Sequence, residues 1–141
     1  MFDLIILTRK VVLQKTAEDA VRILRSSAYP LRKADFEQLA FSMRCAKRSN
    51  GRGIWLIPVR GTISEAGKNI RVTLEIHGDP FFFLGCVIVL AGIAGLFACL
   101  VSHSNIWIPY CAMVFLGLVL CGRSLCEGCE LLDLLEHKLT R

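Results

Sequence analysis

Charged residues are missing from one long continuous part of this sequence. No Lys, Arg, Asp or Glu occurs in residues 80–122, although these four types make up 21% of the 141 residues. Proline is also scarce, with 4 residues, whereas hydrophobic residues make up 54%, above the roughly 45–50% of ordinary soluble domains. These proportions exclude intrinsic disorder and a fibrous repeat, and the concentration of apolar residues in one window excludes a fully soluble globular protein. The sequence therefore indicates an integral membrane protein.

Two apolar stretches fill the uncharged window. Residues 80–102 form a run of 23 and residues 106–122 a run of 17, where a spanning helix needs about 20 residues and at least about 17. Backbone amides find no partners in lipid, so we expect both stretches to be helices. The polar residues His103-Ser104-Asn105 between them predict an antiparallel transmembrane hairpin. Trp107 and Tyr110 follow this hinge, where an interfacial aromatic belt is expected.

The charges outside the window predict the orientation. Residues 1–79 carry 14 Lys and Arg against 8 acids, the hinge carries none, and residues 123–141 carry three basic residues against four acids. The positive-inside rule places both flanks in the cytoplasm and the hinge outside. We therefore expect a multi-pass protein of the cytoplasmic (inner) membrane, of bacterial type, with both termini inside.

Residues 1–79 show the patterns of a small α+β domain. Thr16 with Asp19 three residues later resembles a capping box, and apolar residues then recur at helical spacing over residues 16–28. Strict alternation predicts a strand over residues 69–76. Similar patterns predict strands over 53–64 and 36–45, joined in a meander with Asn50-Gly51 as one turn, and a fourth strand over 2–13. The helix is the natural cover for the apolar face of this antiparallel sheet.

Residues 123–141 predict an amphipathic C-terminal helix. The segment contains six leucines, of which Leu131, Leu132, Leu134, Leu135 and Leu139 carry the pattern, together with Glu127, Glu130, Asp133 and Glu136, which recur every third residue. One interpretation is a solvated continuation of the second span. The other is that the acidic stripe docks on the basic N-terminal domain. The chain thus divides into a domain at 1–79, the hairpin at 80–122 and this tail.

Part of the pattern resembles a known group of proteins. The segment Pro58-Val-Arg-Gly61-Thr-Ile63, the strand at 70–76 and Pro80-Phe81 opening a span are similar to uncharacterised small bacterial membrane proteins. The resemblance covers residues 36–102 and implies a cytosolic α+β domain whose last strand leads into a two-helix hairpin. It departs from the group's pattern in the residues before Pro58. The resemblance implies no catalytic residues.

Cysteine is the residue type that most suggests chemistry. Cys126 and Cys129 form a C-x-x-C, which suits a thiol redox pair or half of a zinc site. No second C-x-x-C exists, Cys121 and His137 lie in the same helical tail, and redox motifs of this kind open a helix in a βαβ context. We therefore interpret the pair as incidental, and expect no metal, cofactor or catalytic residue.

Two other sets of residues carry hypotheses. Lys47, Arg48 and Arg52 lie in a basic, glycine-rich segment that we interpret as a solvated turn, with contact to anionic lipid headgroups as the alternative and nucleic acid disfavoured. Small residues spaced four apart predict the contact between the spans, either within one chain or in a homodimer, and these are Ala91, Gly95, Cys99, Met113, Gly117 and Cys121.

These observations give an α+β membrane protein with a small antiparallel sheet, one covering helix, a transmembrane hairpin and an amphipathic tail. The function we expect is a non-enzymatic, membrane-tethered interaction or accessory module with an unidentified protein partner. Two alternatives are a redox or metal-binding protein that uses Cys126 and Cys129, and a small transport subunit that works as an oligomer.

Overall fold

The computed structural model describes residues 4–28, 35–37, 40–48 and 54–141. The chain forms two compact units. Residues 1–77 and 127–141 make the first, here called the sheet unit, and residues 78–126 make the second, here called the helix-pair unit. Asn50 and Gly51, expected to form a turn, lie outside the described residues, as do Arg52 and Pro30.

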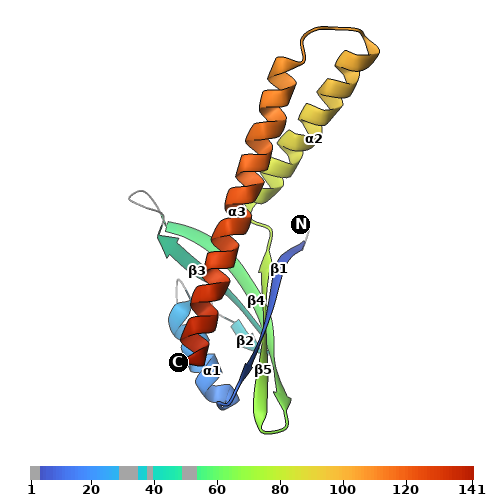
Figure 1. Cartoon of the computed structure of the whole chain (residues 1–141). Helices are drawn as coiled ribbons and strands as arrows, with labels where there is room; N and C mark the ends of the chain where they lie inside the picture. The colour runs from blue at the N-terminus through green and yellow to red at the C-terminus, as the bar shows by residue number, and fades with distance from the viewer. Residues whose placement is uncertain (1–3, 29–34, 38–39, 49–53) are drawn as a thin grey trace. The chain divides into compact units, whose positions relative to one another are not determined.

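The sheet unit contains one antiparallel sheet in the strand order β1-β5-β4-β3-β2 (Figure 1). The strands are β1 (Ile5–Leu13), β2 (Asp35–Glu37), β3 (Ala40–Arg48), β4 (Ile54–Ala66) and β5 (Asn69–His77). The α+β class and the antiparallel sheet are therefore confirmed. The single strand expected over 36–45 is wrong, because β2 and β3 are two strands that pair with each other. Alternation of side chains continues through a reversal of chain direction, so the pattern alone does not show it.

Two-residue periodicity separates the two faces of the sheet. In β5, Ile70, Val72, Leu74 and Ile76 are buried, at most 5% exposed, while the residues between them remain accessible. The register pairs Val72 with Ile63 of β4, so the buried sets of neighbouring strands fall on one face. β4 and β5 meet at a two-residue turn in which Gly67 has φ +66°, a left-handed conformation that glycine adopts without strain.

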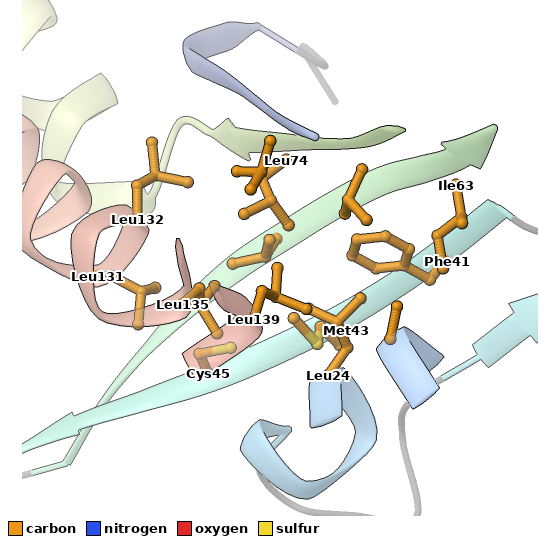
Figure 2. Packing of buried hydrophobic residues seen from close by; sticks show 14 of the residues in the cluster. Leu24, Phe41, Met43, Cys45, Ile63, Leu74, Leu131, Leu132, Leu135 and Leu139 are labelled. Atoms are coloured by element: carbon orange, nitrogen blue, oxygen red, sulfur yellow. The ribbon is translucent and has the colours of Figure 1, made fainter. Parts of the chain in front are cut away.

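Two helical segments of the sheet unit cover its apolar face. α1 (Ala17–Ser27) contributes Ala20 and Leu24, both fully buried, and the Thr16 side chain caps it by accepting from the Asp19 amide at 3.3 Å, as the capping box predicts. The C-terminal part of α3 contributes four leucines that are at most 4% exposed, namely Leu131, Leu132, Leu135 and Leu139. Figure 2 shows their side chains among the other residues of the cluster. The tail is therefore part of the core of the sheet unit.

The two long helices are α2 (Pro80–Val101) and α3 (Ile108–Thr140). α2 starts where the sequence predicts, with Pro80 in the first turn and the Asp79 carboxylate accepting from the Phe82 amide at 2.7 Å. α3 runs for 33 residues without a break, so the tail continues the second apolar stretch as one helix, as the first of the two interpretations has it. Glycine in a helix costs only about 1 kcal/mol relative to alanine, so Gly122 does not end it.

Candidate functional site

The helix-pair unit exposes its apolar side chains. Both α2 and α3 contain a segment long and apolar enough to cross a membrane, and only 17% and 6% of these windows are buried. Leu90, Phe97, Leu100 and Phe115 are each 66–74% exposed. In the described part of the sheet unit, by contrast, nineteen hydrophobic residues form a buried cluster, and four of them belong to α3. Apolar residues of the same kinds thus have opposite burial in the two units.

Glycines mark the contact between α2 and the first part of α3. A Cβ atom added to Gly85 would lie 2.9 Å from the Gly117 carbonyl oxygen, and one added to Gly117 would lie 2.7 Å from the Gly85 oxygen. One added to Gly92 would lie 3.0 Å from the Tyr110 oxygen. Backbones approach this closely only where no side chain intervenes, so small residues do make the contact.

The residues predicted for this contact are placed in a different register. Gly117 lies against Gly85 and Val89 rather than against Gly95, which instead lies under the Tyr110 ring. Ala91 is exposed. The connection explains the shift, because the Cys99 thiol lies 3.3 Å from the Ile106 carbonyl oxygen, so residues 102–107 return alongside the last turn of α2.

The cysteines of the helices fall into two groups. The Sγ atoms of Cys86 and Cys121 lie 3.8 Å apart, whereas Cys126 and Cys129 are exposed in the middle of α3. Within the described part of the chain, no group of three or more His, Cys, Asp or Glu side chains is arranged to hold a metal ion. The contact between Cys86 and Cys121 was not predicted, although both lie one helical turn or less from the glycines that form the close approach.

Polar contacts join the tail to β1 and α1 within the sheet unit. The Arg9 guanidinium of β1 lies 2.5 Å from a Glu136 carboxylate oxygen and 3.0 Å from one of Asp133. The hydrogen bond to Glu136 raises the pKa of Arg9 above its ordinary value, so the guanidinium stays charged. Lys138 Nζ donates to Ser27 Oγ of α1 at 3.3 Å. Acidic residues of the tail therefore contact β1, as the second interpretation expected, and four leucines of the tail are buried in the core.

The other face of the sheet is mainly polar and basic, although Val12 and Leu56 are exposed on it. We call it the open face, and it carries exposed cations on four neighbouring strands, which are Lys10 of β1, Arg71 of β5, Arg60 of β4 and Arg44 of β3. Glu75 is opposite Arg60 in the register, and the two border a shallow hollow of about 440 Å³ together with Ser42 and Thr62. The side chains of Lys47, Arg48 and Arg52, predicted to contact lipid, lie outside the described residues.

One cysteine lies within the core of the sheet unit. Cys45 of β3 is 1% exposed, and burial raises the pKa of its thiol to about 11 despite the nearby Lys138 ammonium. A thiol with so high a pKa is protonated at neutral pH, whereas the thiolate is the nucleophilic form of cysteine. Cys45 is therefore a packing residue.

Comparison of the chain with protein-family models, with curated proteins and with solved structures finds no match. The resemblance to uncharacterised small bacterial membrane proteins therefore stays a hypothesis. The function has to be argued from the two units themselves.

Proposed function

We propose that the chain is a multi-pass protein of the cytoplasmic membrane, in which α2 and the first part of α3 form a transmembrane hairpin. The sheet unit is then a membrane-tethered interaction or accessory module without catalytic activity of its own. The observation that carries this proposal is the opposite burial of apolar side chains in the two units.

The cost of leaving the helix pair in water supports membrane insertion. Burial of apolar surface gains roughly 25 cal/mol per Å², or about 1.5–3 kcal/mol for a large side chain. Among the described residues, twenty large hydrophobic side chains are exposed, and the greater number of them belong to α2 and to residues 106–119. Soluble monomers rarely expose contiguous apolar patches above a few hundred Å². Lipid covers such a surface all round, which suits two helices with no charged residue before Arg123.

The charge distribution supports a cytoplasmic position for both termini. The 14 basic residues before position 80 all precede α2, while residues 102–107, which connect α2 to α3, carry no Lys or Arg. Translocating the basic side would oppose the positive-inside rule, so the hinge is the part that we place outside the membrane.

The open face supports an interaction role and indicates the chemistry of a partner. Among the side chains of this face that the structure describes, four are exposed cations and one is a carboxylate, that of Glu75, so the face favours an acidic surface. Nucleic acid fits less well, because single-stranded chains are held largely by stacking on aromatic side chains, and Phe41, the aromatic residue bordering the hollow, is buried. An acidic protein surface is therefore the partner that we propose.

Accessibility of the hinge tests the topology. In a variant whose native cysteines are replaced, a cysteine at Ser104 should react with a membrane-impermeant thiol reagent in intact cells. A cysteine at Ser64, an exposed position on the open face, is the matched control and should react only after the membrane is opened. Reaction of Ser64→Cys alone in intact cells, or extraction of the protein by alkaline carbonate, would contradict the proposal.

Charge reversal tests the interaction role. Arg60→Glu with Arg71→Glu should abolish in-cell crosslinking to an acidic partner, while Lys68→Glu, a similar change in the turn before β5, should not. Membrane insertion should be equal in both variants. Crosslinks that survive the double change, or that Lys68→Glu removes equally, would reject the open face as the interaction surface.

A further inference from the structure

Two thiols meet across the helix pair. The Sγ atom of Cys86 in α2 lies 3.8 Å from the Sγ atom of Cys121 in α3, which is contact distance for two sulfur atoms. The Cys121 thiol also donates to the Phe82 carbonyl oxygen at 3.6 Å. The two residues are 35 positions apart in the chain, so the packing of the helices, not local sequence, brings them together.

Glycine makes the space for this contact. A Cβ atom at Gly85 would lie 2.7 Å from Cys121 Sγ, closer than real atoms approach, so any larger residue there would displace the thiol. Gly117, one turn before Cys121, provides the same close approach from the other helix. The thiols therefore lie where the two backbones are nearest, as a bond between two short side chains requires.

Other cysteines of the two helices have different surroundings. The Cys99 thiol is directed to the Ile106 carbonyl oxygen, and Cys111 is exposed on the outer surface of α3. Cys126 and Cys129 are exposed beyond the apolar part of α3. A cysteine in an apolar helix is on its own only a small apolar residue. The pairing of Cys86 with Cys121 is what sets this site apart.

We propose that Cys86 and Cys121 are an oxidative modification site, at which a hydroperoxide forms a reversible disulfide that fastens α2 to α3. One thiol reduces the hydroperoxide, ROOH, to the alcohol ROH and becomes a sulfenic acid. The second thiol displaces water from that sulfenic acid, and the S–S bond forms. Overall, two thiols and one ROOH give one disulfide, ROH and H₂O, with the two electrons passing from sulfur to the peroxide oxygen.

Charge favours a disulfide over a metal at this position. Two thiolates that bind a soft monovalent ion such as Cu(I) leave one net negative charge, and an uncompensated charge in apolar surroundings is costly. The nearest carboxylate along α2 is that of Asp79, which would add to this cost and already accepts from the Phe82 amide and from Ser124 Oγ. A disulfide is neutral and needs no counterion.

The environment also determines how long the disulfide lasts, and this step rests on the proposed membrane insertion. Cys86 lies six residues into α2, about 9 Å along the helix from Pro80. Glutathione is charged and stays in water, so it reaches a disulfide within lipid slowly. A small neutral dithiol reaches it readily. Membrane burial would thus make the modification persist under conditions in which exposed cytosolic disulfides are reduced.

Cleavage at the hinge measures the disulfide directly. The test variant keeps Cys86 and Cys121, has alanine at the other five cysteines and carries a protease site inserted after Ser104. The control keeps Cys99 and Cys121, so each helix still holds one thiol. Isolated membranes are treated with tert-butyl hydroperoxide, cut at the inserted site and run on a non-reducing gel. The test chain should remain joined and separate after dithiothreitol, whereas the control should separate at once.

Two fragments from the oxidised test variant, or equal joining in the control, would overturn the proposal. In case the replacements disturb folding, mass spectrometry of the oxidised wild-type chain should find the Cys86–Cys121 peptide pair, and its absence would likewise overturn the proposal. Gly85→Ala, which displaces the Cys121 thiol, should slow disulfide formation several-fold, and an unchanged rate would contradict the geometry.

Reduction by glutathione distinguishes the modification site from the membrane proposal. The disulfide should resist glutathione in closed membranes and lose that resistance in detergent. Equal, rapid reduction in closed membranes and in detergent would contradict burial of this segment in lipid. The proposal that Cys86 and Cys121 form a disulfide would still stand.

Discussion

Replacing Leu135 by alanine should destabilise the sheet unit strongly, because this side chain of α3 is 1% exposed within the core. Truncating a fully buried leucine removes about 1.5–3 kcal/mol of burial free energy, and the cavity that remains adds to the loss. The expected decrease in the free energy of unfolding is therefore about 3–5 kcal/mol. That is a large part of the 5–15 kcal/mol by which domains are stable.

The neighbouring residue supplies the control. Leu134 is 52% exposed on the same turn of α3, so Leu134→Ala should change stability by less than about 0.5 kcal/mol. Urea unfolding of the purified full chain in mild detergent, followed by circular dichroism at strand wavelengths, measures both variants against the wild type. Equal effects of the two substitutions, or no effect of Leu135→Ala, would refute the assignment of the tail to the core.

Three further changes test other contacts. Burial raises the pKa of Cys45 from about 9 to about 11, so the protonated thiol contributes stability that is present below pH 9 and lost as pH rises through 11. Between neutral pH and pH 10, the free energy of unfolding of the wild type should fall by about 1 kcal/mol more than that of Cys45→Ala. Urea unfolding at a series of pH values measures this difference. Gly61→Ala should destabilise the sheet by about 1–3 kcal/mol, because its Cβ atom would lie 2.0 Å from a backbone oxygen of β5, whereas Gly122→Ala meets nothing within 4 Å and should not, as thermal unfolding checks. Arg9→Met should lower the melting temperature slightly at low salt and not at 1 M salt, where charges are screened beyond about 3 Å; an equal decrease at both would show that packing, not charge, holds Arg9.

The features that the sequence predicted well are those that local chemistry controls. Alternation of apolar and polar side chains marks β5 because a strand exposes successive residues on opposite faces, and Ile70 to Ile76 follow this rule in the structure. Thr16 and Asp79 cap their helices because a side-chain oxygen needs only an amide two or three residues away. Such features need no knowledge of the rest of the chain.

The features that the sequence did not predict depend on distant contacts. Spacing alone suggested that Gly95 and Gly117 face each other, but the return of residues 102–107 beside α2 moves the contact to Gly85 and Gly117. The contact of Cys86 with Cys121 follows from that register, and was missed with it. Helix spacing defines a face of each helix, whereas the register between two helices depends on the length and path of the connection.

Leucines of α3 show that residue type alone does not determine whether a side chain is buried. Leu116 and Leu118 are 53% and 56% exposed in α3, while Leu135 and Leu139 of the same helix are at most 1% exposed. Since all four have the same side chain and the same backbone conformation, only their surroundings differ. In the first part of α3 we propose that lipid provides those surroundings, and in the last part the buried faces of β3, β4 and β5 provide them. The change falls between Arg123, the first charged residue of α3, and Leu131, the first of its buried leucines. α3 therefore passes from one apolar environment to the other without a break in its backbone. What changes along the helix is the pattern of charged side chains.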